Sequence, residues 1–337
     1  MKHIHKRYTV IFCGLAMAIL ILDSRTALEG CREGIALCMQ TVIPSVFPFL
    51  ILSGILVDGL QEKGIRSDKH LPLWGFILGS VGGYPTGARC VDGWVATGML
   101  TKEKGKRLLA YCSNTGPAFL FGIGIQILPS IGLCWIVWCI HILSAILVRL
   151  CIPHLHSARD KSYVQAISHS AGIMKQALTH MATICGWVTV IRMLLMFLQR
   201  WVFCLMPQWV VVLCSGVLEL ANGCVLLPEI GSVGSRLVCF AVMLSFGGIC
   251  VWLQTISVVR HTDTNWYLPG KITQAAISVL LCIPAQYLLP VQQRFYIAWP
   301  IAGLCACICG LWPIFCRKPK IRLAFSESTV YNEANST

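Results

Sequence analysis

Four groups of polar and helix-breaking residues interrupt apolar stretches of this sequence, and they carry most of the chemistry that the chain offers. The first, Gly79–Ala88, holds four glycines and Pro85 within ten residues. Proline removes a backbone donor and glycine lowers the cost of leaving the helix, so this segment is expected to unwind. Unwound backbone within a bilayer cannot bond to lipid and must line a cavity or pack against protein. We expect a solute to meet Gly82, Gly83, Tyr84, Pro85 and Gly87; the alternative is a tight loop between two helices.

The second group is Ser113-Asn-Thr-Gly-Pro117, in the middle of the apolar run Leu108–Leu128. Polar groups in an apolar environment cost free energy unless they are paired. Pro117 leaves a backbone carbonyl one turn earlier without its hydrogen-bond donor, and Asn114, Thr115 or a solute can supply that donor. We expect Asn114 and Thr115 to face a cavity; the alternative is that they bond neighbouring helices together.

The third group centres on Glu219, the acidic residue deep in the apolar stretch Val202–Leu227. Intramembrane carboxylates commonly mark a functional site. Asn222 lies three residues further on, so the two side chains can share one helix face. The alternative is a Glu219 that pairs with Arg192 or lies near the membrane surface.

The fourth group is Ser245-Phe-Gly-Gly248, followed by Gln254 among apolar residues. It shares the pattern Ser-x-Gly-Gly with Ser80–Gly83 of the first group, which favours two related halves. Glycine-interrupted segments at corresponding places in two halves indicate a transporter binding site. Ser245, Gly247, Gly248 and Gln254 therefore join the candidate substrate-binding residues.

Signatures of enzymes and metal sites are missing from the sequence. It has neither the G-x-x-x-x-G-K-[ST] phosphate loop nor the H-E-x-x-H zinc motif. Most of the nineteen cysteines lie in apolar runs and read as small packing residues, without the C-x-x-C spacing of zinc sites. We therefore expect no catalytic residue, no metal and no cofactor, and we expect that the chain is not an enzyme.

The elements that must hold these groups are membrane helices. The 337 residues are 56% hydrophobic and only 12% charged, about half the charged fraction of a soluble domain. Uncharged apolar runs of about 18 or more residues predict spanning helices. The expected spans are Tyr8–Leu22, Ile35–Val57, Leu108–Leu128, Ile131–Cys151, Ile173–Leu198, Val202–Leu227, Ile272–Leu289 and Phe295–Phe315.

Two further apolar segments, Leu71–Trp94 and Leu237–Val259, are interrupted and are predicted to be re-entrant hairpins. The expected fold is thus an all-α polytopic membrane protein with about eight spanning helices, two re-entrant or broken segments and two related halves. Residues 1–30 form an N-terminal span and external loop, and residues 31–316 form the membrane domain, with halves 35–151 and 173–315. Residues 317–337 form a cytoplasmic tail that is first basic and then disordered.

The net charge of +13 lies in short connecting loops, as the positive-inside rule expects of a membrane protein. We place the basic N-terminus, loops 63–69, 102–107 and 149–161, and the tail in the cytoplasm. Nucleic-acid binding is disfavoured, since no basic and aromatic face forms outside the membrane. Placing both hairpins on the cytoplasmic side favours parallel halves, whereas the transporter analogy favours inverted halves, and the sequence leaves both open.

The sequence resembles sporulation membrane proteins of the nucleoside-recognition (Gate) domain family. The similarity covers roughly residues 30 to 310. It rests on Pro44–Leu52, Gly83-Tyr-Pro-Thr-Gly-Ala88, Asn114-Thr-Gly-Pro117, Glu219-Leu-Ala-Asn-Gly223 and Ser245-Phe-Gly-Gly248 with Gln254. Ala221 departs from the pattern, which has a hydroxylated residue there. The resemblance implies a relative of concentrative nucleoside transporter cores, located in the mother-cell or outer forespore membrane and needed for heat-resistant spores.

The expected function is therefore a permease for a small polar solute, nucleoside-like or other, in a sporulating cell. The alternative is a non-transporting structural or assembly factor of the spore envelope membrane. The expected partners are the lipid bilayer and the solute, with a second copy of the chain or other sporulation membrane proteins as further candidates.

Overall fold

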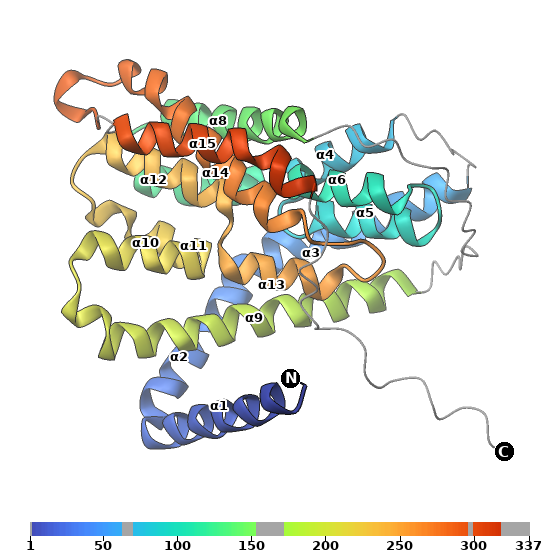
Figure 1. The fold of residues 1–337 in the computed structure, drawn as a ribbon. Coiled ribbons are helices and arrows are strands. Elements are labelled where there is room, and N and C mark those ends of the chain that lie inside the picture. The colour runs from blue at the N-terminus through green and yellow to red at the C-terminus, as the bar shows by residue number, and fades with distance from the viewer. Residues whose placement is uncertain (1, 63–69, 153–171, 296–298, 318–337) are drawn as a thin grey trace.

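The computed structural model describes residues 2–62, 70–152, 172–295 and 299–317. Within these ranges the regular elements are all helices, joined by turns and short irregular segments, and no strand occurs (Figure 1). The expectation of an all-α membrane protein is confirmed at this level. The basic loop 63–69, most of the basic loop 149–161 and the tail beyond Arg317 lie outside the described residues.

The helices differ greatly in length, since several apolar stretches are divided by a break. In chain order the α-helices are α1 Lys2–Leu22, α2 Ser24–Leu37, α3 Ile43–Glu62, α4 Leu71–Gly82, α5 Thr86–Ala96, α6 Lys102–Cys112, α7 Pro117–Ile127, α8 Ile131–Cys151, α9 Ile173–Trp201, α10 Gln208–Leu218, α11 Leu220–Leu226, α12 Val233–Phe246, α13 Gly248–Val258, α14 Tyr267–Ala285 and α15 Trp299–Arg317.

Five helical stretches in the described part are long and apolar enough to cross a membrane. They are 102–127 (α6 with α7), α8, α9, 233–258 (α12 with α13) and 267–288 (α14 with the turn after it). A sixth span results if the bent pair Ser24–Val42 and Val46–Leu56, which meet at 54°, is counted as one. Large apolar side chains such as Trp135, Leu143 and Leu150 of α8 are exposed on the outside of the bundle, as lipid-facing side chains would be.

The segment Leu71–Trp94 folds as a helical hairpin of α4 and α5. The two short helices pack so closely that a Cβ atom on Gly87 would lie 2.7 Å from the Cα atom of Gly79. The Cys112 carbonyl oxygen, at the end of α6, fits between them and would lie 1.7 Å from a Cβ atom on Gly79. Glycine is therefore required at Gly79 and Gly87, because a side chain at either position would displace the backbone at Cys112, which packs between α4 and α5.

Two expectations about the later breaks are wrong. Leu237–Val259 is not a hairpin: α12 and α13 form one stretch of 26 residues, divided by Gly247 and Gly248 at φ 83° and 86°. Val202–Leu227 is not a span, because the chain turns back at Glu219, whose backbone is extended at φ −147° and ψ 123°. Gly216 and Gly223 then meet, so that α10 and α11 form the second hairpin. The two Ser-x-Gly-Gly motifs thus lie in different structural settings, one in a hairpin and one in a broken span.

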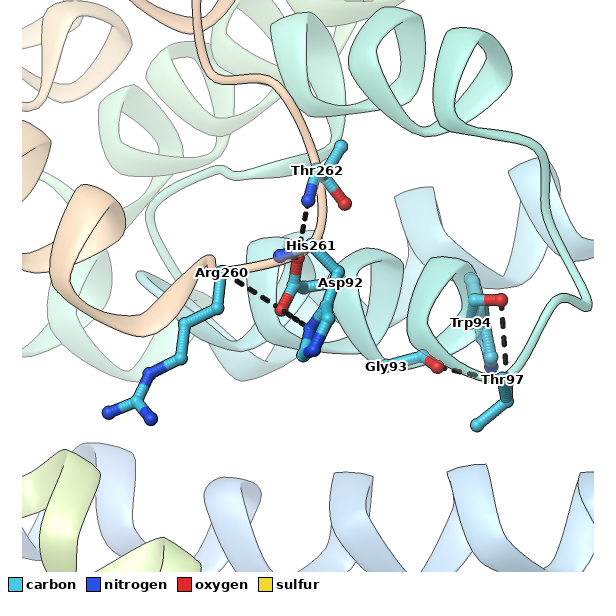
Figure 2. A network of polar contacts seen from close by, with 7 residues as sticks. All are labelled: Asp92, Gly93, Trp94, Thr97, Arg260, His261 and Thr262. Atoms are coloured by element: carbon cyan, nitrogen blue, oxygen red, sulfur yellow. Dashed lines mark hydrogen bonds and ion pairs between the residues drawn. The ribbon is translucent and has the colours of Figure 1, made fainter. Parts of the chain in front are cut away.

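The two broken spans run antiparallel. Lys106 near the start of α6 pairs with Asp263 after the end of α13, at 3.0 Å. Asp92 on α5 fixes the same loop, because its carboxylate accepts the backbone N–H groups of residues 260–262 at 2.8–3.0 Å (Figure 2). The start of the first broken span therefore lies beside the end of the second, and the two breaks come to the same level between them.

Candidate functional site

The break between α6 and α7 places polar groups in the interior of the bundle. Ser113 and Gly116 adopt extended backbone, and Pro117 begins α7, where its missing N–H costs nothing. Asn114 is fully buried. Its amide nitrogen donates to Ser80 Oγ at 3.2 Å and to the Tyr111 carbonyl at 3.0 Å. These two bonds orient the amide and leave Oδ1 facing α14.

Lys271 of α14 meets this oxygen. Its Nζ donates to Asn114 Oδ1 at 3.2 Å and to Gln274 Oε1 at 2.7 Å. Gln274 is oriented in turn by bonds from its Nε2 to Asn114 Oδ1 and to the His141 carbonyl, both at 3.2 Å. Lys271 and Gln274 are both fully buried. Among the described residues, no carboxylate forms an ion pair with Lys271.

His141 of α8 links the two breaks. The backbone N–H of Thr115 donates to its Nε2 at 3.1 Å, so this nitrogen carries no proton. The proton then lies on Nδ1, which faces Ser245 Oγ at 3.2 Å. Ser245 continues to Ser278 of α14 at 2.7 Å. His141 is therefore a neutral imidazole that bridges the first break to the second.

Tyr84 and Thr115 meet the second break directly. The Tyr84 hydroxyl donates to the Leu244 carbonyl at 3.0 Å, and the Thr115 hydroxyl donates to the same oxygen at 3.1 Å. This carbonyl lies in the last turn of α12, where intrahelical partners end. The bend of the first hairpin and both breaks thus share one hydrogen-bonded centre.

Glu219 shapes the second hairpin by capping α11. Its Oε1 accepts the Ala221 N–H at 3.0 Å, and its Oε2 accepts both the backbone N–H and the side-chain amide of Asn222 at 2.7 Å. The Asn222 oxygen is contacted by Arg192 of α9, which forms an ion pair with Glu33 of α2. The alternative of a direct pair between Glu219 and Arg192 is therefore wrong, since Asn222 lies between them.

A pocket of about 90 Å³ lies between the two hairpins, next to the polar centre. This is room for a few water molecules or part of a small solute. Its polar lining comes from Thr41, Thr115, Glu219 and Gln254, with the backbone of Gly82, Gly83 and Gly116. Its apolar lining consists of Leu37, Val42, Val46, Phe49, Val81, Tyr84, Ala118, Phe119, Ile184, Val188, Leu220, Ala221 and Val251.

The structure brings part of the predicted set to this pocket. Its lining includes Gly82, Gly83, Tyr84, Thr115, Glu219 and Gln254. The other predicted residues lie behind the wall. Asn114 and Ser245 belong to the buried polar network, Asn222 supports Glu219, and Gly87 packs against Gly79. Gly247 and Gly248 pack against the Tyr84 hydroxyl and the Gly216 carbonyl, and Pro85 leads into α5.

Lys271, Gln274 and His141 were not among the site residues predicted from the sequence. Lys271 is the one charged residue between Asp263 and Arg294, which was the available signal. The span predicted from the sequence begins one residue later, at Ile272, and leaves Lys271 just outside it. Within the described residues, no group of three or more His, Cys, Asp or Glu side chains could hold a metal ion.

Comparison with known proteins gives one curated similarity. Over 116 residues the chain is 28% identical to the sporulation integral membrane protein YlbJ of Bacillus subtilis. The match covers 31% of this chain and 28% of that protein. No protein-family model matches the chain, and no solved structure matches it. The similarity supports a relationship with a sporulation membrane protein.

Proposed function

We propose that this chain is a transporter-like permease for a small polar solute in the membrane of a sporulating cell, and not an enzyme. The observation that carries the proposal is the pocket, since every break in the first hairpin, the first broken span and the second hairpin contributes to its wall. Discontinuous membrane helices line binding sites because their free backbone groups need partners other than lipid.

The order of elements supports two related halves of inverted topology. Each half has a helical hairpin, a broken span and an unbroken span: α4 to α8 in the first, and α10 to α14 in the second. The broken spans run antiparallel, as an inverted repeat requires. In this pairing Ser113–Gly116 corresponds to the break at Gly247, and the bend at Gly82–Pro85 corresponds to Glu219.

The lining predicts the chemistry of the solute. Glu219 uses its carboxylate for three hydrogen bonds, and a carboxylate offers about four acceptor positions, so one is left for a donor on the solute. Across the pocket, Gly116 has no side chain to cap α7, and the N–H groups of Ala118 and Phe119 have no intrahelical partner. The pocket therefore suits a partly apolar solute with both a hydroxyl or amino donor and an acceptor. Nucleosides satisfy this description.

The test uses the full chain in liposomes, with a panel of labelled nucleosides as probes. Glu219→Gln is expected to lower uptake about tenfold or more, because a hydrogen bond to a charged group contributes about 1.5–3 kcal/mol. Glu229→Gln, at an exposed carboxyl outside the pocket, is the matched control and is expected to behave as the wild type. Equal uptake by all three proteins contradicts the proposed site.

Spore heat resistance separates the permease from an assembly factor. We expect Glu219→Gln to reduce the count of heat-resistant spores in the host of this chain, in parallel with the loss of uptake. An assembly factor predicts normal spores with Glu219→Gln and defective spores after changes in the loop 102–107, so that result would reverse the proposal.

A further inference from the structure

Lys271 points toward the middle of the helix bundle and away from the nearer end of its own helix. Trp266, just before α14, stacks with Lys106 near the start of α6, and the loop before it carries Asp263, so this end of α14 lies at the end of the bundle. Lys271 is five residues further along, about 8 Å deeper at the rise of a helix. A membrane lysine near a helix end normally extends its ammonium toward water. Lys271 instead reaches the break at Asn114 and also bonds Gln274, one turn deeper.

The surroundings of Nζ are compatible with both the neutral amine and the ammonium form of Lys271. A neutral amine has two N–H donors, and the oxygens of Asn114 and Gln274 use both. An ammonium has a third donor, and this group lies 5.2 Å from the ring centre of Tyr84. A cation over an aromatic ring is worth about 0.5–2 kcal/mol. Protonation of Lys271 therefore mainly changes its contact with the Tyr84 ring, and Tyr84 belongs to the pocket wall.

The neighbouring titratable groups do not replace Lys271 in this role. They are Cys112 on α6, His141 on α8 and Tyr84 at the hairpin bend, and no described carboxylate faces Nζ. His141 holds a fixed tautomer, because Thr115 N–H occupies its Nε2. A proton on that nitrogen would break the bond between α8 and the first break.

We propose that Lys271 is the proton-binding group of the permease, and that a proton is the coupling ion. The inference rests on the proposed function. A hydronium ion that enters by the pocket, whose wall includes Tyr84 beside Nζ, gives its proton to Nζ. The O–H bond of the hydronium breaks and an N–H bond forms, and the ammonium later returns the proton to a water molecule. The ammonium holds the Tyr84 ring, and the neutral amine releases it. Tyr84 also bonds Leu244, so its release loosens the contact between the first hairpin and the second broken span.

Uptake of labelled uridine into liposomes that contain the full chain tests the coupling. A proton gradient, acidic outside, is expected to stimulate uptake by the wild type. Lys271→Arg keeps a charge that is not lost at accessible pH and is expected to abolish the stimulation. Lys175→Met, at an exposed lysine on α9, is expected to keep it. Uptake by the wild type that ignores the gradient overturns the proposal while leaving the permease intact.

A second measurement does not depend on transport. We compare the unfolding temperature of the wild type with that of Lys271→Met from about pH 6 to about pH 9. The difference varies with pH wherever the folded and unfolded chains bind different numbers of protons at Lys271. A lysine that titrates in the folded protein gives a difference that is constant at low pH and begins to change within this range, whereas an amine that is always neutral gives a difference that changes throughout and also overturns the proposal. Lys175→Met serves as the control. A constant difference overturns proton binding at Lys271, whatever uptake shows. A difference that begins to change within this range, with no uptake of any probe, supports proton binding and contradicts the permease.

Discussion

The Tyr84 hydroxyl donates a hydrogen bond to the Leu244 carbonyl at 3.0 Å, across 160 residues of sequence. This contact joins the bend of the first hairpin to the second broken span. Its position beside the pocket means that any movement of the hairpin against the second half must stretch or break it.

Tyr84→Phe removes the hydroxyl and keeps the ring. We expect the free energy of unfolding to fall by about 1 kcal/mol, since a neutral buried hydrogen bond contributes about that amount. Thermal unfolding followed by tryptophan fluorescence measures the change. Tyr287→Phe, at a ring that is 66% exposed, is the control and should leave stability unchanged. Equal stability of all three proteins would show that the Leu244 contact contributes nothing.

Asn114 and Lys271 are expected to be energetically coupled. Asn114→Ala leaves the buried Lys271 without one acceptor and should destabilise the protein by about 2–4 kcal/mol. In a Lys271→Met background, where no amine remains, the same change should cost clearly less. A double-mutant cycle of unfolding free energies gives the coupling between the two. Additive effects within about 0.5 kcal/mol would argue against the bond.

Asp92 is expected to control the loop after α13. Its carboxylate accepts three consecutive backbone N–H groups, from Arg260 to Thr262, and also faces the His261 ring at 3.1 Å (Figure 2). Asp92→Ala should accelerate hydrogen exchange of these amides about tenfold or more, which corresponds to about 1.4 kcal/mol.

The neighbouring Asp263 offers the control for this loop. It forms a part-exposed ion pair with Lys106, and such pairs contribute about 0–1 kcal/mol. Asp263→Ala should therefore change exchange at residues 260–262 only slightly. If both variants accelerate hydrogen exchange at residues 260–262 equally, the hydrogen bonds of Asp92 do not stabilise the loop more than the Asp263 ion pair does.

Gly79→Ala should prevent the first hairpin from closing, because its Cβ atom would overlap the Cys112 carbonyl oxygen. We expect little folded protein in detergent, as judged by size-exclusion chromatography. Gly122→Ala meets nothing within 4 Å and lies on a helix, where alanine is favoured over glycine by about 1 kcal/mol. It should fold normally. A well-folded Gly79→Ala protein would contradict the close crossing of α4, α5 and the end of α6.

The sequence predicted the membrane class and three of the four breaks, because glycine and proline act locally, whereas the break at Glu219 fell inside a predicted continuous span. It did not predict how each break folds. Gly247 and Gly248 allow a span to continue after a local kink, whereas Glu219 turns the chain back by capping α11 with its own carboxylate. In the sequence, the glycine pair and Glu219 both appear as interruptions of an apolar stretch. Whether the chain continues or turns back there depends on which distant helix the segment packs against.

The polar network was harder to foresee for the same reason. Asn114, His141 and Lys271 are far apart in sequence and meet only after α6, α8 and α14 pack together. A lysine at the start of an apolar run looks like a topological charge, and only the packing shows that it points inward.

A substitution that fills the pocket tests the account most directly. Ala118 lines the pocket, and Gly122 lies one turn further along α7 with no atom within 4 Å of its Cβ position. Labelled-nucleoside uptake by liposomes containing wild type, Ala118→Leu or Gly122→Leu is the measurement. We expect Ala118→Leu to fold and to lose uptake, whereas Gly122→Leu should keep it. Equal uptake by both variants would contradict a solute path through this pocket.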